Sequence, residues 1–306
     1  MQETRVQELS EHVDETVVLR GWLHNVRSSG RISFLQVRDG SGFVQVVADR
    51  SILGDIAYEQ VKRLSQEEPI TVQGRVRTDQ RAPGGVEIDA DRVERLAENQ
   101  GEYPITPKEH GVDFLMDHRH LWLRSPRQRA ILRIRAEVIA AAEQFLNAEG
   151  FLRVDSPILT GNAAEGTTTL FAVDYFGEPA YLSQSGQLYA EASAMAVGRA
   201  YCFGPTFRAE RSKTRRHLIE FWMLEPEMAF LEHEGNMDLQ ERLVSHMVAQ
   251  VLLRCAPELE AIGRDPEVLR RVKPPFPRVT YDDALQILAA KGLSLSWGED
   301  FGAPHE

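Results

Sequence analysis

The chain has 306 residues, of which 42% are hydrophobic and 26% charged, a composition that excludes disordered and fibrous proteins and predicts about two globular domains. Its net charge of −11 argues against the uniformly basic surface of a general nucleic-acid coat, so any polyanion must bind at local basic clusters. The opening residues hold no apolar segment of the secretory type, and nowhere do about 18 apolar residues run together, so we expect a cytoplasmic protein. Cys202 and Cys255 lie far apart without a C-x-x-C motif, which predicts two buried thiols rather than a disulfide or a zinc site.

Residues 16–93 alternate between short strand-like runs and turns rich in Gly, Ser and Asp. The strand-like runs are residues 16–29, 31–50, 70–79 and 84–96. Between the second and third runs, residues 55–65 predict a single helix. About five strands with one inserted helix outline a five-stranded Greek-key barrel, and an ordinary β sandwich is the alternative. We expect this first domain to span residues 1–98.

Residues 98–108 contain two prolines and a glycine without hydrophobic periodicity, so we place a hinge or linker at residues 99–126. Apolar residues then recur at three- and four-residue spacing over 128–148, which predicts a long helix stopped by Gly150. The run FLRVDSPIL predicts a buried strand that ends at Pro157. Further strands are expected at residues 180–183, 199–210 and 218–230, and further helices from residue 185, over 235–253 and over 281–291. Long antiparallel strands with helices packed on them predict an α+β fold for a second domain at residues 127–306.

The segment from Phe203 to Phe230 carries the most informative side chains of the chain. Its residues 208–217 hold five cations against one acid, a pattern that fits a polyphosphate ligand. The cations are Arg208, Arg211, Lys213, Arg215 and Arg216, and the acid is Glu210. Period-two alternation places Phe221 and Glu225 on one face of the returning strand, with Glu227 beside them. Since a core-facing strand would not normally carry carboxylates, we interpret this face as a binding surface; the alternative is a hairpin whose solvated face carries salt bridges.

The residues of this segment resemble a known family. F-R-x-E, a basic loop, R-H-L and then E-F-x-x-L-E-x-E-M are similar to motif 2 of the class II aminoacyl-tRNA synthetases, in the aspartate, asparagine and lysine subgroup. RHLWLR at residues 119–124 and the helix and strand that end in FLRVDSPILT resemble the same subgroup, the latter its motif 1 with Pro157. GWLHNVR…FLQVRDGSGFVQVV resembles the subgroup's anticodon-binding OB-fold. The resemblance covers nearly the whole chain and implies an ATP-dependent ligase that joins an amino acid to tRNA through an adenylate.

Motif 2 implies a role for each matching residue in binding ATP. Activation requires the amino-acid carboxylate to attack the α-phosphorus of ATP, and a planar guanidinium can hold both anions in fixed geometry. The resemblance assigns this role to Arg208, adenine stacking to Phe221 and the adenine edge to Glu210. It assigns the terminal phosphates to Arg216 and His217, with Mg²⁺ as the expected cofactor beside ATP. By themselves, a lone Phe or His in a strand would more often belong to a core.

The resemblance also implies an amino-acid pocket. Glu165, Ser185 and Gln187 match positions that hold the ammonium group of the substrate. Aspartate enzymes of the subgroup carry a Lys in S-P-Q-L-[FY]-K-Q, whereas here the run is S-G-Q-L-Y-A-E, with Ala190 at that place. A buried aspartate side chain without a cation would be costly, while the carboxylate of Glu225 can accept a hydrogen bond from an amide. We therefore expect asparagine as the substrate, and an aspartate enzyme that also charges asparagine tRNA is the alternative.

Three residues of the first domain match positions that read the central uridine shared by the aspartate and asparagine anticodons. Phe34 matches the stacking position, and Gln45 and Arg27 lie near it in the predicted barrel. Each of the three can instead be an ordinary core or surface residue of the barrel, and for Gln45 the two interpretations are about equal. The motif 1 resemblance further implies a homodimer, with Pro157 at the interface.

The third motif of the family, G-G-G-x-G-x-x-R, does not occur in the sequence, nor do the acidic residues that hold Mg²⁺ just before it. We therefore assign no metal ligand within these residues and expect a fragment of a longer chain. A non-catalytic, OB-containing RNA-binding relative of the family is the alternative from another functional class.

Overall fold

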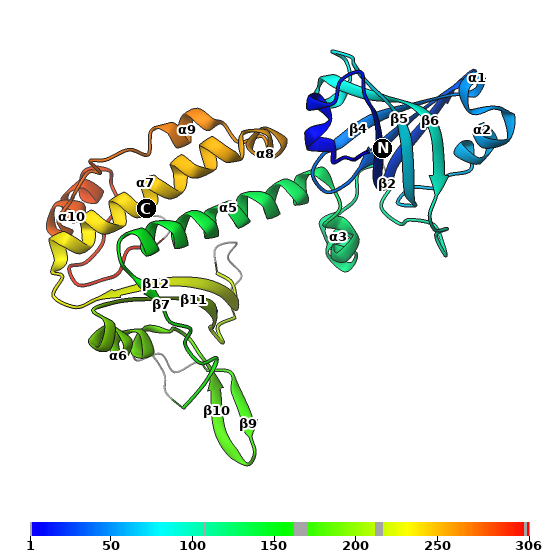
Figure 1. Ribbon diagram of the computed structural model, residues 1–306. Helices are drawn as coiled ribbons and strands as arrows, with labels where there is room; N and C mark the ends of the chain where they lie inside the picture. Colours follow the sequence, from blue (N-terminus) through cyan, green and yellow to red (C-terminus); the bar gives the residue numbers. More distant parts are fainter. Residues whose placement is uncertain (1, 107, 162–169, 212–216, 303–304, 306) are drawn as a thin grey trace. The chain divides into compact units, whose positions relative to one another are not determined.

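The computed structural model describes residues 2–106, 108–161, 170–211, 217–302 and 305. It divides the chain into two compact units, Met1–Arg119 and His120–Glu306 (Figure 1). The domain limits expected from the sequence, with a linker at 99–126, stay a prediction. Among the described residues, none of the helices combines the length and apolarity that a membrane span requires.

The first unit is a closed β-barrel. Its strands are β1 (Gln2–Glu3), β2 (Thr16–Ser29), β3 (Ile32–Arg38), β4 (Phe43–Asp49), β5 (Pro69–Thr78) and β6 (Val86–Arg95). The sheet runs in the order β1-β2-β3-β4-β6-β5, and β2 also pairs with β5, so the five long strands close on themselves. Alternate residues of these strands, such as Leu19, Leu35 and Ile88, are fully buried in one core. The predicted five-stranded barrel is confirmed, and the β sandwich is excluded.

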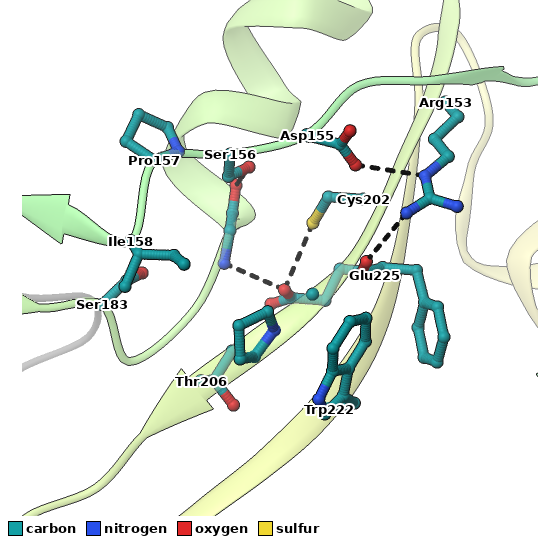
Figure 2. Close-up of a pocket in the computed structure, with 14 residues that line it drawn as sticks. Arg153, Asp155, Ser156, Pro157, Ile158, Ser183, Cys202, Thr206, Trp222 and Glu225 are labelled. Atoms are coloured by element: carbon teal, nitrogen blue, oxygen red, sulfur yellow. Dashed lines mark hydrogen bonds and ion pairs between the residues drawn. The ribbon is translucent and has the colours of Figure 1, made fainter.

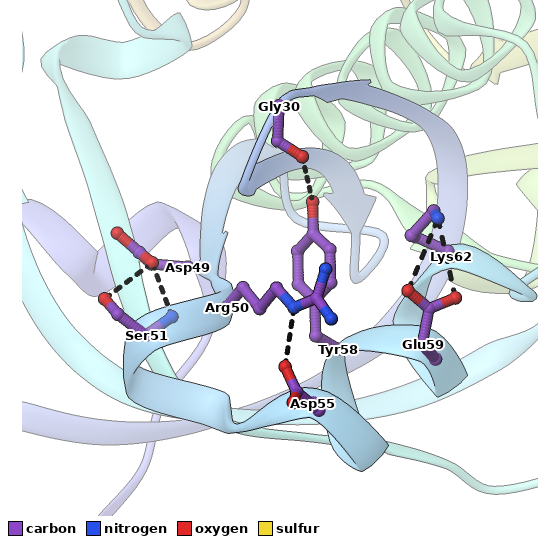
Figure 3. A network of polar contacts seen from close by, with 8 residues as sticks. All are labelled: Gly30, Asp49, Arg50, Ser51, Asp55, Tyr58, Glu59 and Lys62. Carbon is purple, nitrogen blue, oxygen red and sulfur yellow. Dashed lines mark hydrogen bonds and ion pairs between the residues drawn. The ribbon is translucent and has the colours of Figure 1, made fainter.

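The first unit also contains short helices. They are η1 (Val6–Glu11), α1 (Arg50–Leu53), α2 (Asp55–Lys62), η2 (Pro83–Gly85) and α3 (Val112–Asp117). The predicted helix over 55–65 is α2, and Gly54, with φ of 78°, separates it from α1. Tyr58 of α2 is buried and donates to the carbonyl oxygen of Gly30 at 3.4 Å, while Arg50 pairs with Asp55 at 2.6 Å (Figure 3). These contacts fasten α1 and α2 to each other and to the β2–β3 turn.

The pairing of β5 with β6 is irregular at Gly74. The register shifts between Gln73 and Gly74, where Gly74 faces Ala90. A Cβ atom on Gly74 would overlap the carbonyl oxygen of Asp89 and lie 2.8 Å from the Cα of Ala90. Glycine at this position therefore permits the two backbones to approach closely, as glycines in strands often do.

We predict that Gly74→Ala lowers the stability of the barrel by about 2 kcal/mol, because the new methyl group must displace backbone rather than a flexible side chain. Urea denaturation measures the change. Gly101→Ala is the matched control, since a Cβ there meets no atom within 4 Å. Equal unfolding midpoints for the two variants would contradict the prediction.

The second unit combines helices with two small sheets. Its helices are α4 (Arg119–Trp122, which begins at the last residue of the first unit), α5 (Pro126–Ala148), α6 (Gln187–Val197), α7 (His233–Arg254), α8 (Ala256–Ala261), α9 (Pro266–Arg270) and α10 (Tyr281–Ala290). Its strands are β7 (Leu152–Arg153), β8 (Leu159–Thr160), β9 (Ala172–Tyr175), β10 (Glu178–Leu182), β11 (Arg199–Phe207) and β12 (Glu220–Met228). One sheet has the order β8-β10-β9 and the other β12-β11-β7. Strands with helices packed on them confirm the α+β prediction.

The core of this unit lies between the β11–β12 hairpin and the long helices α5 and α7. Tyr201 of β11 is buried with Leu146 of α5 and Leu243 of α7, and Phe203 and Leu224 pack against them. The opposite face of the hairpin stays available for other contacts. Both cysteines are free and buried, which confirms that part of the sequence analysis.

The prediction of a buried strand over FLRVDSPIL is wrong. Only Leu152 and Arg153, together with Leu159 at the start of β8, lie in strands there, and all three are exposed, with Leu152 at 54%. Phe151 alone is fully packed, whereas Ile158 and Leu159 are exposed at the edge of the unit. An apolar run has the same sequence pattern whether it fills a core or lies on an uncovered edge, so periodicity does not separate the two cases.

Candidate functional site

The β11–β12 hairpin has one face in the core and one face directed to a candidate site. The register pairs Cys202 with Glu225 and Thr206 with Phe221, so these four side chains share the face opposite Tyr201. Helix α6 packs against both strands (Figure 1). The period-two interpretation of the returning strand therefore placed Phe221 and Glu225 on one face correctly.

Arg208 lies one residue beyond the end of β11, next to Phe221. Its backbone N–H donates to the carbonyl oxygen of Ile219 at 2.9 Å, which continues the ladder past the strand. Its guanidinium carbon lies 5.3 Å from the centroid of the Phe221 ring, a cation–π arrangement. Arg208 is exposed and Phe221 is half-buried, so a planar guanidinium and an aromatic face are presented side by side.

The other residues assigned to ATP are only partly described. Glu210 and His217 are exposed on either side of residues 212–216. Arg216 lies outside the described residues, as does Glu165 of the expected amino-acid pocket. The roles of these four residues stay predictions.

Hydrogen-bond donors surround the carboxylate of Glu225 (Figure 2). Ser185 Oγ donates to one oxygen, and the backbone N–H of Gly186 donates to the other at 2.9 Å. The thiol of Cys202 lies 3.3 Å from that second oxygen. Burial, and then the neighbouring Glu225 carboxylate, raise the pKa of Cys202 to about 12, so the sulfur keeps its proton at neutral pH and acts as a donor. Sequence reasoning assigned no role to Cys202 or Gly186. Cys202 has no local pattern that signals this contact, and the one signal for Gly186 is its place in the S-G-Q-L-Y-A-E run, where the aspartate pattern has Pro.

A cavity of about 230 Å³ opens beside Glu225, at the edge of β11 beyond the short strand β7 (Figure 2). Its wall includes Ser156, Ile158, Gly186, Cys202, Trp222 and Glu225. The chain at this edge is fixed by backbone hydrogen bonds, from Ser183 N to Ile158 O at 2.8 Å and from Phe207 N to Ser183 O at 2.8 Å. The hairpin thus borders a hollow that a small molecule can enter, rather than a flat solvated surface.

The first turn of α6 carries the next predicted residues. Ser185 Oγ accepts from the backbone N–H of Gln187 at 3.0 Å, so its hydroxyl both binds the first residue of α6 and donates to Glu225. The amide nitrogen of Gln187 donates to Glu191 at 3.0 Å, which leaves its carbonyl oxygen as an acceptor. Ala190 is 1% exposed and lies on the inner side of α6. The predicted group of Ser185, Gln187, Ala190 and Glu225 is therefore close together at one end of α6.

The site is acidic. Burial raises the pKa of Glu227, and the carboxylates of Glu191 and Glu225 raise it further. Three carboxylates in one region favour a ligand that brings a positive charge or several hydrogen-bond donors.

The raised pKa of Glu227 predicts a pH-dependent stability. A carboxyl whose pKa is higher in the folded state than its ordinary value of 4.5 binds its proton more tightly when folded, so its contribution to stability is lost as the pH rises above 4.5. We expect Glu227→Gln to raise the melting temperature at pH 7.5 relative to wild type, by about 2 °C or less because the group is partly exposed, and to raise it less at pH 4.5.

Thermal unfolding at the two pH values checks this prediction. Glu220→Gln is the matched control, because it removes an exposed carboxylate from the same strand. The same pH dependence in the two variants, or a melting temperature lowered by Glu227→Gln at pH 7.5, would contradict it.

In the first unit, Arg27, Phe34 and Gln45 lie on one face of adjacent strands. Arg27 pairs with Phe34 across β2 and β3, and Gln45 pairs with Gln36, which is two residues from Phe34 on β3. Arg27 is exposed, and Phe34 and Gln45 are half-buried. The geometry allows one ligand to meet all three predicted residues.

Glu87 of β6 holds the side chain of Gln45. The amide nitrogen of Gln45 donates to Glu87 at 2.7 Å, and Arg77 pairs with the other oxygen of Glu87 at 2.6 Å. Since its N–H group is bound to Glu87, Gln45 presents its carbonyl oxygen as an acceptor. Sequence reasoning missed Glu87, which has the alternating position of a strand residue but is 2% exposed.

Among the described residues, no group of three or more His, Cys, Asp or Glu side chains is placed to hold a metal ion.

Comparison with protein families matches two parts of the chain. Residues 111–306 match the family described as tRNA synthetases class II (D, K and N). Residues 17–96 match the OB-fold nucleic acid binding domain, which agrees with the closed barrel of the first unit.

Similar proteins cover the whole chain. An asparagine–tRNA ligase of Desulforamulus reducens is 58% identical over 306 residues, which is 100% of this chain and 71% of the relative. One of Chloroflexus aurantiacus is 55% identical, over 97% of this chain and 69% of the relative. The solved structure of asparaginyl-tRNA synthetase from Pyrococcus horikoshii complexed with asparaginyl-adenylate has a TM-score of 0.93 and 39% identity, and covers 99% of this chain and 70% of that one.

Proposed function

Since the chain belongs to the class II tRNA synthetases of the aspartate, lysine and asparagine group, we propose that its activity is the ATP-dependent ligation of asparagine to tRNA. The observation that carries the proposal is the identity of 55–58% to asparagine–tRNA ligases along the chain. Neither an aspartate enzyme nor a non-catalytic RNA-binding relative is favoured. The geometry of the site supports the same chemistry.

In the first step, the asparagine carboxylate attacks the α-phosphorus of ATP, a C–O–P linkage forms, and pyrophosphate leaves. Arg208 would hold the substrate carboxylate and an α-phosphate oxygen together and stabilise the negative charge that develops between them. The Phe221 ring beside it would stack on adenine, 5.3 Å from the Arg208 guanidinium carbon. No side chain of the enzyme acts as a nucleophile in this scheme.

The amino-acid end of the site would bind the ammonium group and the side-chain amide separately. The carbonyl oxygen of Gln187 and the remaining lone pair of Ser185 Oγ are acceptors for the ammonium group. The Glu225 carboxylate accepts hydrogen bonds only, so it suits the NH₂ of asparagine and repels the carboxylate of aspartate. Ala190 offers no cation that could compensate an aspartate side chain.

In the second step, a terminal hydroxyl of tRNA attacks the adenylate carbonyl, and AMP leaves. The OB-fold unit would hold the anticodon through the face of Arg27, Phe34 and Gln45. A uridine has one ring N–H donor, which matches the carbonyl oxygen that Gln45 presents, and Phe34 supplies a stacking surface.

Two further features complete the proposal. The exposed apolar edge around Pro157, with Leu152, Ile158 and Leu159, supports a homodimer formed through this segment.

The negative charge of ATP supports a requirement for Mg²⁺. A cytoplasmic location stays a prediction.

Arg208→Ala should lower asparagine-dependent ATP–pyrophosphate exchange by about 10² or more, because one preorganised donor to the developing charge is lost. Arg208→Lys should lose less, since it keeps the charge but not the planar fork. The measurement is the exchange rate of the intact protein with saturating asparagine.

Arg271→Ala, which removes an exposed cation just beyond α9, is the matched control for the loss of one positive charge. Undiminished exchange in Arg208→Ala would refute its role. A wild-type protein that activates aspartate in preference to asparagine would refute the proposed substrate.

Phe34→Ala should weaken tRNA binding by roughly 5- to 100-fold, the effect of losing one base–aromatic stacking contact. Phe34→Tyr keeps an aromatic face and should stay within a few-fold of wild type by the same argument. The Kd for asparagine tRNA is measured for both, together with the melting temperature. Equal affinities of the two variants would show that the ring does not stack on a base.

A further inference from the structure

Gly186 immediately precedes α6, and the side chains of Cys202 and Ser156 lie next to its Cα atom. A Cβ atom on Gly186 would overlap Cys202 Sγ, lie 2.8 Å from Ser156 Oγ and lie 3.2 Å from a carboxylate oxygen of Glu225. The backbone at Gly186 has φ of −86°, which any residue can adopt. Glycine is therefore required here by the close approach of its neighbours and not by its dihedral angles.

The same residue supplies a donor that no side chain replaces. Its backbone N–H donates to a carboxylate oxygen of Glu225 at 2.9 Å, and the Cys202 thiol lies 3.3 Å from the same oxygen (Figure 2). The Ser185 hydroxyl donates to the other oxygen. Ser185 Oγ accepts from the N–H of Gln187, so its own hydrogen is left for Glu225. These three hydrogen-bond donors carry no positive charge, and together they fix the rotation of the Glu225 carboxylate about its side-chain bonds.

A carboxylate has about four lone-pair directions, and the donors from Ser185, Gly186 and Cys202 occupy three of them. The Glu225 carboxylate can therefore accept a hydrogen bond from a ligand along one remaining direction. A free carboxylate could instead turn its oxygens toward any cation or donor that a ligand carries, and its preference for an amide would weaken.

We propose that Gly186 is a positioning residue for amino-acid specificity: its peptide N–H and its missing Cβ hold Glu225 in the orientation that accepts from the asparagine amide. This inference rests on the proposed function. It adds that specificity depends on a backbone N–H group of Gly186 that acts through Glu225.

The test compares Gly186→Ala with Gly186→Pro, each combined with Cys202→Ala, which removes the sulfur and makes room for a Cβ atom. Alanine keeps the N–H, and proline lacks it, while the φ of −86° is close to the value of about −65° that proline imposes. We expect the KM for asparagine to be roughly tenfold higher, or more, in the proline variant, the effect of one lost hydrogen bond to a charged group. The preference for asparagine over aspartate in kcat/KM should fall in parallel, and the KM for ATP should differ little between the two variants.

A second comparison does not need proline. Gly186→Ala in wild-type protein should raise the KM for asparagine, because its methyl group overlaps the sulfur, and it should raise the KM less when it is introduced into Cys202→Ala protein, where the sulfur is absent. A purely structural role would change the KM values for asparagine and ATP together, and the melting temperature with them.

The outcomes separate the two proposals. Wild-type protein that supports no exchange with asparagine would overturn the proposed function. Wild-type protein that prefers asparagine, with equal KM values for asparagine in the alanine and proline variants, would overturn the role of Gly186 alone. If the proline variant does not fold, that role is overturned by an unchanged KM for asparagine in Gly186→Ala, or by an equal rise of that KM when Gly186→Ala is introduced into wild-type and into Cys202→Ala protein.

Discussion

The hydrogen bonds around the Glu225 carboxylate are the constraint on which the amino-acid end of the site depends. They join three segments that are distant in sequence: the turn before α6, the strand β11 and the strand β12. Glu225 is half-buried, and a carboxylate partly withdrawn from water is stabilised by such donors, so the site requires these three segments to keep their places relative to one another. The register of β11 with β12 pairs Cys202 with Glu225 and thereby brings the thiol donor to the carboxylate.

The two faces of the β11–β12 hairpin divide the tasks of the second unit. One face supplies Tyr201, Phe203 and Leu224 to the core with α5 and α7, and this packing makes the hairpin rigid. The other face presents polar groups to α6 and to the cavity. Because side chains alternate along a strand, a slip of one residue would exchange the faces and destroy core and site together. The core thus stabilises the geometry on which the proposed specificity depends.

The sequence predicted those features that depend on local periodicity. Alternation located the strands of the barrel to within a few residues, and period two placed Phe221 and Glu225 on one face of β12. The same reasoning failed for FLRVDSPIL, since exposure of Leu152 and Ile158 depends on what covers them and not on the run itself. It could not find the contacts of Gly186 and Cys202 with Glu225, because partners 39 and 23 residues away are brought together only by the fold. Glu87 was missed for the same reason, since its partner Gln45 lies 42 residues away.

The charge of the site is consistent with a neutral side chain on the substrate. Glu191, Glu225 and Glu227 make the electrostatic potential more negative where the ammonium group would bind. Burial, and then the carboxylates of Glu191 and Glu225, raise the pKa of Glu227. Free asparagine brings one ammonium group, one carboxylate, which we propose that Arg208 holds, and an amide with two donors. Aspartate would bring a second carboxylate toward Glu225. The two carboxylates would repel each other, and the methyl group of Ala190 carries no positive charge that could compensate the repulsion. Each added negative charge in a partly buried site is opposed by those already there, so the acids that attract the ammonium group also reject the acidic analogue. Attraction and rejection thus arise from the same three carboxylates, and this requires the orientation of Glu225, not only its presence.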